Sequence, residues 1–217
     1  MTNPEFSIEF DILYNNISSN KAPGLNEYEK SVFLTKAQEQ IVTELYSGRN
    51  TTYNSFEETE ELRRYLNSLV ITHSCQIPEG SPNHVTSKSY SFVLPEDLLY
   101  ITYEVCKNTS MKDFPVYPVS QDELSKIMNN PFRGPSKHRV LRLDNGTNTV
   151  EIISNEEIII YNLRYIRKPN PIILTDLEDE LSINGVSEES VCELDSSLHR
   201  TILDRAVALA LQTMYSK

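Results

Sequence analysis

The sequence predicts an α+β fold, with an N-terminal helical pair, an antiparallel β-sheet of three to five strands and a long apolar C-terminal helix. Apolar residues recur at three- and four-residue steps in 26–47 and 195–216, as on one face of a helix. Between them, 86–168 holds β-branched and aromatic runs broken by Asn, Gly and Pro, which is typical of strands and turns. A hydrophobic fraction of 39% in 217 residues is enough for a core.

The first helix of the pair is predicted over residues 26–47. Asn26 and Glu29 have the spacing of a capping box, in which each side chain binds the other residue's backbone amide. Gly48 stands where a helix is expected to end. The apolar face is formed by Leu34, Ala37, Ile41 and Leu45.

The second helix of the pair is predicted over about 56–70. Ser55 and Glu58 repeat the capping-box spacing, and further glutamates fill the first turns, where they suit the positive end of the helix dipole. We interpret this acidic run as a solvated helix start rather than as a metal site. The apolar face is formed by Leu62, Leu66 and Leu69.

The middle of the chain is predicted to be mainly extended. Asn145-Gly146 is a hairpin signal between two of its segments, and Pro115 and Pro118 interrupt another. A short helix is predicted at 121–128. The extended segments are 89–94, 98–106, 114–119, 139–143, 149–154 and 157–168.

The last helix is predicted from about 195 to 216. Its apolar residues cover more than the ~100° stripe of an ordinary surface helix. We therefore expect it to be buried on several sides, either as the central core helix or under a neighbouring subunit. Its candidate interaction residues are Leu198, Ile202, Leu203, Val207 and Leu211.

No repeat or low-complexity segment divides the chain, so one domain is expected. An N-terminal extension at 1–25 is predicted to precede a single α+β domain at 26–217. That domain is expected to contain a helical part at 26–72, a mainly β part at 86–168, a loop at 169–193 and the C-terminal helix at 195–216.

The net charge of −11 disfavours binding to nucleic acid and to anionic membranes. One basic stretch departs from this, with Arg133, Lys137, His138, Arg139 and Arg142. We interpret it as a solvated or partner-facing strand edge, with Arg139 and Arg142 as candidate contacts. Beside it, Phe132 in an Asn-Pro-Phe-Arg-Gly-Pro segment either anchors a partner or folds back onto the core.

The sequence offers little sign of catalysis. It lacks the GxGxxG, GxxxxGK[ST], HExxH and GxSxG motifs, and its three cysteines and four histidines show no metal-ligand spacing. We therefore predict no enzyme activity, cofactor or metal. His199 is expected to be a partly exposed helix residue paired with a carboxylate, or else a pH-sensitive contact. The alternative of a small hydrolase would centre on the acidic residues at 176–180. No apolar run is long enough to span a membrane.

Several segments together resemble one family. They are FDILYNN at 10–16, APGL at 22–25, EYEKSVFLTKAQ at 27–38, NPFRGP at 130–135, LRYIRKP at 163–169, and CELDSSLHRTI at 192–202 followed by Ala206-Val207. This pattern resembles the head–tail connector (neck adaptor or ring) proteins of tailed bacteriophages, most of all those of crAss-like phages. It departs from the small connectors in having a substantial β region.

The resemblance implies a structural virion protein that forms a neck ring of about twelve copies. Such a ring joins the portal vertex to the tail, lines the DNA passage and contacts the portal protein and other neck or tail proteins. The resemblance implies no sequence-specific DNA binding and transfers no active-site residues. It also implies synthesis in the host bacterial cytoplasm and a final place in the neck or tail. Another tail or baseplate adaptor is the alternative within the same class.

Overall fold

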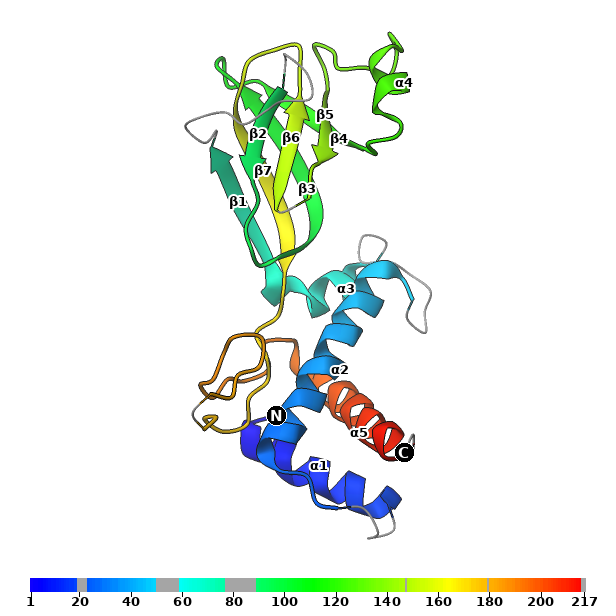
Figure 1. The fold of residues 1–217 in the computed structure, drawn as a ribbon, viewed down its shortest axis with the longest axis vertical. Helices are drawn as coiled ribbons and strands as arrows, with labels where there is room; N and C mark the ends of the chain where they lie inside the picture. Colours follow the sequence, from blue (N-terminus) through cyan, green and yellow to red (C-terminus); the bar gives the residue numbers. More distant parts are fainter. Residues whose placement is uncertain (19–22, 50–58, 77–88, 147, 179, 216–217) are drawn as a thin grey trace. The chain divides into compact units, whose positions relative to one another are not determined.

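The computed structural model describes residues 1–18, 23–49, 59–76, 89–146, 148–178 and 180–215. The chain forms two compact units (Figure 1). The first, called the helical unit below, consists of Met1–Leu69 and Lys168–Lys217. The second, called the β unit, consists of Val70–Arg167. The chain thus leaves the helical unit once, forms the β unit and returns.

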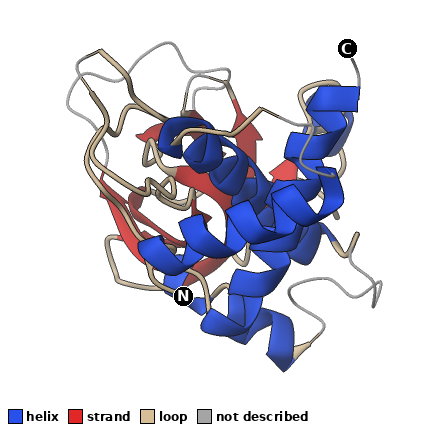
Figure 2. Ribbon diagram, turned by 90° about the horizontal axis from the view of Figure 1, so that it is seen from below, coloured by secondary structure: helices blue, strands red, loops and turns tan. Residues whose placement is uncertain are grey.

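Three long helices form most of the helical unit: α1 (Asn3–Ser18), α2 (Glu27–Ser47) and α5 (His199–Tyr215). α2 and α1 both pack against α5, and the helices cross one another rather than running side by side (Figures 1 and 2). The core of this unit is apolar. Its buried side chains include Phe6, Phe10, Tyr14, Leu34, Ile41 and Ile202.

The predicted ends of α2 are confirmed. Asn26 Oδ1 accepts a hydrogen bond from the Glu29 amide at 2.8 Å, and Glu29 Oε2 accepts one from the Asn26 amide at 2.9 Å, which completes the capping box. Gly48 follows the last helical residue in the left-handed conformation, with φ at 73°. Glycine is favoured there because it has no side chain to collide with the backbone.

The second predicted helix is shorter than expected. The cap expected at Ser55 and Glu58 lies outside the described residues. Within the part that the structure describes, helix α3 covers only Glu60–Tyr65, and Thr59 caps it through the Leu62 amide. A 3-10 turn at Asn67–Leu69 follows, and a strand begins directly after it. The β-branched run Val-Ile-Thr at this point explains the change, because such residues favour strands.

Residues 1–25, expected to form an extension, contain helix α1. Phe6, Phe10 and Tyr14 recur at every fourth position and are at most 1% exposed, so this face of α1 belongs to the core. α1 packs on α5, which lies at the other end of the sequence. The single-domain expectation stays a prediction.

The segment between the β unit and α5 is irregular, as predicted, but it is closely packed. Residues 172–174 are buried. Polar side chains of α2 satisfy their backbone: Thr35 Oγ1 accepts from the Ile172 amide and Ser31 Oγ from the Leu174 amide, each at 3.0 Å. Buried amides need such partners, so α2 carries hydroxyl groups among the apolar and polar residues of its buried face.

The β unit is a seven-stranded sheet in the order β1-β7-β3-β4-β5-β6-β2. All its neighbouring strands are antiparallel except β4 and β5, which are parallel. The two edge strands, β1 and β2, contact each other, so the sheet is curled (Figure 1). The strands are β1 (Val70–Gln76), β2 (Ser89–Val93), β3 (Leu98–Asn108), β4 (Asp113–Val119), β5 (Val140–Asp144), β6 (Thr149–Ile153) and β7 (Ile158–Arg167).

The α+β class is confirmed, but the sheet has more strands than the predicted three to five and is mixed rather than antiparallel. No strand is predicted from the sequence at β1. Residues 114–119 are predicted as a short extended piece because of Pro115 and Pro118, although both prolines lie within β4. β4 and β5 run parallel because the chain between them forms helix α4 (Leu124–Met128) and a loop instead of a hairpin.

The C-terminal helix is amphipathic, and the expectation that it is buried on several sides is wrong. Its residues alternate between a buried face and an exposed face that includes Arg200, Asp204 and Ala208. The buried face packs on α1 and α2 of the same chain. Of the two alternatives, the helix is therefore a core element of the helical unit.

Candidate interaction surfaces

The structure separates the eight predicted interaction residues into three groups. The five on α5 and the turn before it belong to the core of the helical unit, where they are 0–8% exposed. Arg142 belongs to the interior of the β unit. Phe132 and Arg139 lie together in a surface loop. The core residues are Leu198, Ile202, Leu203, Val207 and Leu211, and their role in assembly stays a prediction.

Arg142 forms a largely buried ion pair. Its Nη1 donates to both carboxylate oxygens of Glu104 at 2.9 Å, and each side chain is 12% exposed. The Tyr161 hydroxyl donates to the same carboxylate at 2.6 Å. Burial, followed by the neighbouring Glu104 carboxylate, raises the pKa of Tyr161 above its ordinary value. Arg142 thus balances a carboxylate inside its own unit, and its role as a contact stays a prediction.

Phe132 projects from a loop between α4 and β5, and its exposed fraction of 86% is the highest among the large apolar residues that are described. The loop is closed by a bond from the Gly134 amide to the Asn130 carbonyl at 2.8 Å. Asn130 Oδ1 also accepts from the Phe132 amide at 2.9 Å. Arg139 donates to the carbonyls of Phe132 and Gly134, and its guanidinium lies 5.8 Å from the ring centre of Tyr117. Of the two alternatives for Phe132, folding back onto the core is therefore wrong.

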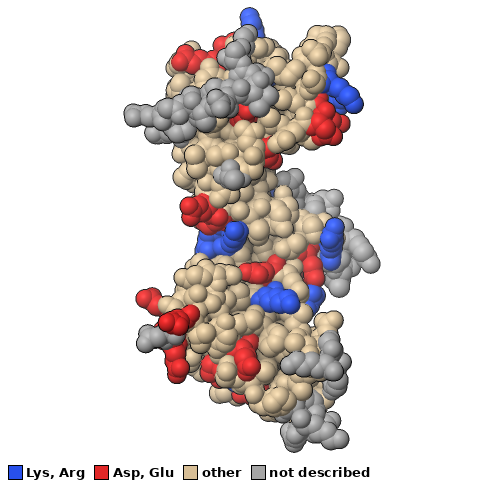
Figure 3. Space-filling model, viewed as in Figure 1, with Lys and Arg blue, Asp and Glu red and all other residues tan. Residues whose placement is uncertain are grey.

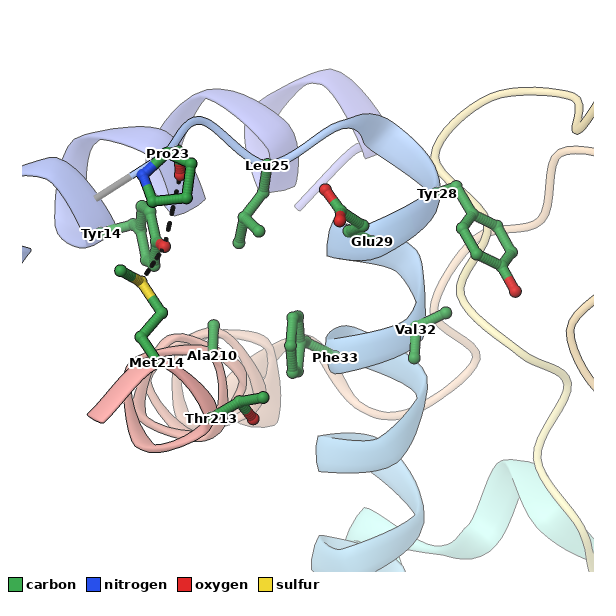
Figure 4. Close-up of a pocket in the computed structure, with 10 residues that line it drawn as sticks. All are labelled: Tyr14, Pro23, Leu25, Tyr28, Glu29, Val32, Phe33, Ala210, Thr213 and Met214. Atoms are coloured by element: carbon green, nitrogen blue, oxygen red, sulfur yellow. Dashed lines mark hydrogen bonds between the residues drawn. The ribbon is translucent and has the colours of Figure 1, made fainter. Parts of the chain in front are cut away.

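The helical unit contains an apolar pocket of about 560 Å³ (Figure 4). α1 and the turn before α2 form one wall, α2 a second and α5 a third. The Tyr14 hydroxyl closes one end, with Met214 Sδ and the Pro23 carbonyl oxygen both within hydrogen-bonding distance as acceptors. The lining residues are Tyr14, Pro23, Leu25, Tyr28, Glu29, Val32, Phe33, Ala210, Thr213 and Met214.

This pocket is not predicted from the sequence. Tyr28, Val32 and Phe33 lie outside the stripe that defines the α2 core face. The signal that could have predicted the pocket is the presence of apolar residues beside the core face of α2. Such a second apolar face either packs against another element or lines a pocket. The α5 wall comes from residues about 180 positions further along the chain, and no local pattern places it here.

Charge is unevenly divided between the two units. Residues 1–69 and 168–217 contain twenty acidic and ten basic residues, whereas residues 70–167 contain eleven and ten. The stretch 124–143 has five basic residues and no acidic one. On the face drawn in Figure 3, acidic side chains are scattered rather than gathered into one cluster. The net charge of −11 therefore comes almost wholly from the helical unit.

The groups considered for chemistry do not converge. Asp176 is exposed, and its carboxylate accepts from the Glu189 amide at 2.7 Å, which fixes a turn. No group of three His, Cys, Asp or Glu able to hold a metal occurs among the described residues. Cys75 and Cys106 are free and buried, and burial raises the pKa of Cys75 to about 11, so this thiol stays protonated. The described helices include none that is long and apolar enough to cross a bilayer.

His199 is more buried than expected, at 6% exposed. Its ring lies 5.5 Å from that of Phe6, and Nε2 lies 3.1 Å from the Leu194 carbonyl oxygen. Burial lowers the pKa of His199 below its ordinary value, because the charged form loses its hydration there. Nδ1 lies 2.6 Å from the Met1 amine, so a backbone carbonyl and the N-terminal amine take the place of the expected carboxylate partner.

Comparison with known proteins relates this fold to one group. The chain matches the family model described as phage tail ring protein 3/4 over residues 1–217. It is 48% identical to "Ring protein 3" of Bacteroides phage crAss001 over 97% of this chain and 95% of that protein. It is also 41% identical to "Ring protein 4/5" of the same phage, over 95% of this chain and 90% of that protein. The similarity spans both the helical unit and the β unit.

Proposed function

From the premise that the chain belongs to the phage tail ring protein 3/4 family, we propose that it is a structural virion protein whose copies form a ring in the neck. This ring joins the portal vertex to the tail and surrounds the path of the DNA. The observation that carries the proposal is similarity over almost the full length to two proteins that are both named as rings.

A closed ring is the expected form, because repeated head-to-tail contacts between identical subunits form a ring when their rotations complete a full turn. The resemblance to neck ring proteins implies about twelve copies. Each subunit then needs two different surfaces, one for each neighbour. The chain offers two such features in the Phe132 loop and the pocket of the helical unit.

The acidic character of the chain suits a DNA passage. A surface with net charge −11 repels the phosphate backbone, so DNA would slide through the ring without being held. The basic residues of 124–143 do not contradict this, because Arg142 is paired with Glu104 and Arg139 binds loop carbonyls. Sequence-specific DNA contacts are not expected.

The neighbours along the axis are proposed to be the portal protein and other neck or tail proteins. Because two relatives in one phage carry ring names, a related ring is a natural neighbour on one side. A place lower in the tail is the second candidate, and it is favoured by the word "tail" in the description of the family.

The test is the mass of the purified chain, measured by light scattering at several concentrations, alone and with the portal protein of its phage. A ring of about twelve subunits, or a complex formed with portal, supports the neck position. A ring that ignores portal supports the lower position in the tail. A chain that stays monomeric at all concentrations and with portal contradicts the ring proposal.

A further inference from the structure

We propose that Phe132 and its loop form the projecting half of the contact between neighbouring copies of this chain, and that the pocket between α1, α2 and α5 of the next copy receives it. This inference rests on the proposed ring, since its occupant is a second copy. It names the two surfaces that a head-to-tail contact requires.

The loop is built to hold Phe132 outward. Bonds from the Gly134 amide and from Arg139 fix its backbone, and the Asn130 side chain fixes the Phe132 amide. A side chain added at Gly134 would approach the Asn130 carbonyl to 3.1 Å, so the turn is also tight. A loop that is already ordered loses little conformational entropy on binding. An exposed aromatic residue on such a loop has the character of an interface anchor.

The pocket suits an aromatic guest. It holds about 560 Å³, within the range of pockets that enclose small ligands. Most of its wall is apolar or aromatic, with the ring of Phe33 and the side chains of Leu25 and Met214 facing the hollow (Figure 4). Burying a Phe removes roughly 150–250 Å² from water, which would cover apolar surface on both partners.

Charge also favours this pairing. The loop lies beside Arg133 and Lys137, whereas Arg142 of the same stretch is paired with Glu104 and does not count toward this charge. The pocket belongs to the unit that carries twice as many acidic as basic residues, and Glu29 lies in its wall. Opposite charges around an apolar anchor speed association and exclude the wrong orientation. Two pockets or two loops facing each other would bring like charges together, so the contact is heterologous.

Cross-linking of two full-length variants tests this contact directly. Both carry Cys192→Ser to remove the half-buried thiol, and the other two cysteines are buried. One variant adds Arg133→Cys beside the intact Phe132, and the other adds Thr213→Cys in the exposed part of the pocket wall. Under mild oxidation we expect a disulfide-linked dimer in the mixture and much less in either variant alone.

The dependence on Phe132 makes the test specific. Adding Phe132→Ala to the loop variant should lower the cross-linked yield by more than about tenfold, the effect of losing an interface anchor. Adding Tyr103→Ala, which removes another exposed aromatic residue of the β unit, should leave the yield unchanged. Circular dichroism and thermal unfolding of each variant show that folding is intact.

The outcomes separate this contact from the ring itself. A cross-link that Phe132→Ala does not reduce overturns the contact. If the unmodified chain assembles but the mixture gives no cross-link, the ring proposal stands and the contact is overturned. If the chain does not assemble and no cross-link forms, the two proposals fail together.

Discussion

The stripe on α5 and the Phe132 loop are both apolar in sequence, yet the structure gives them opposite surroundings. Leu203 in the stripe is 1% exposed, whereas Phe132 is 86% exposed. The stripe repeats with the period of a helix and is covered by α1 and α2 of its own chain. Phe132 is a single aromatic residue between two prolines and has no periodic neighbours. A periodic apolar pattern therefore indicates a face that its own chain can cover, whereas an isolated aromatic residue on an ordered loop points to another molecule.

The largest loss of stability is expected from a substitution in the buried stripe of α5. Leu203→Asp places a charge in the core of the helical unit and should lower the free energy of unfolding by about 4 kcal/mol or more. Urea unfolding followed by circular dichroism measures this. Ala208→Asp, on the exposed face of the same helix, is the matched control and should be close to neutral. Wild-type stability for Leu203→Asp would mean that this face of α5 is turned to water.

The next largest effect is a difference in stability loss between alanine substitutions of two arginines in the same basic stretch. Arg142→Ala leaves the Glu104 carboxylate largely buried without its cation and should lower the free energy of unfolding by about 3 kcal/mol. Arg139→Ala removes bonds to loop carbonyls near the surface and should lower it by less than about 1 kcal/mol. Urea unfolding followed by tyrosine fluorescence compares them. Equal losses would contradict the assignment of Arg142 to the interior.

These two arginines show where sequence reasoning stops. Capping residues and a helical stripe are local, so α2 could be predicted to within a residue of its ends. The pairing of Arg142 with Glu104 joins residues 38 positions apart, and the parallel pairing of β4 with β5 depends on the crossover between them. The pocket joins α1 and α2 to the last turns of α5. Of the eight predicted interaction residues, only Phe132 and Arg139 lie together at the surface. The type of residue alone does not predict that exposure.

A smaller effect is expected from pH, through the imidazole of His199 beside the α5 stripe. Burial lowers the pKa of His199 in the folded chain, so the unfolded chain binds a proton first as pH falls. The free energy of unfolding should therefore decrease as pH falls below about 6.5, by at most about 1.4 kcal/mol per pH unit. It should level off below the folded-state pKa.

Urea unfolding between pH 7.5 and 5 measures this slope. Above pH 5 the ordinary range of carboxylates is avoided. His199→Gln should flatten the slope, and His138→Gln, at an exposed position in the β unit, should not. A slope that survives His199→Gln would assign the pH dependence to another group.

The smallest effect on stability is expected at Phe132. This substitution best separates a residue needed for assembly from one needed for folding. Because the side chain is 86% exposed, Phe132→Ala should change the free energy of unfolding by less than about 0.5 kcal/mol. The same substitution should abolish assembly of the purified chain in light scattering if the ring depends on this anchor. Tyr103→Ala, which removes a ring that is 61% exposed, should keep both stability and assembly. A residue that leaves folding intact but is required for assembly belongs to the interface, whereas Leu203 should fail both measurements because its contacts lie within its own chain. A clear loss of stability in Phe132→Ala would instead show that the ring packs on the subunit that carries it.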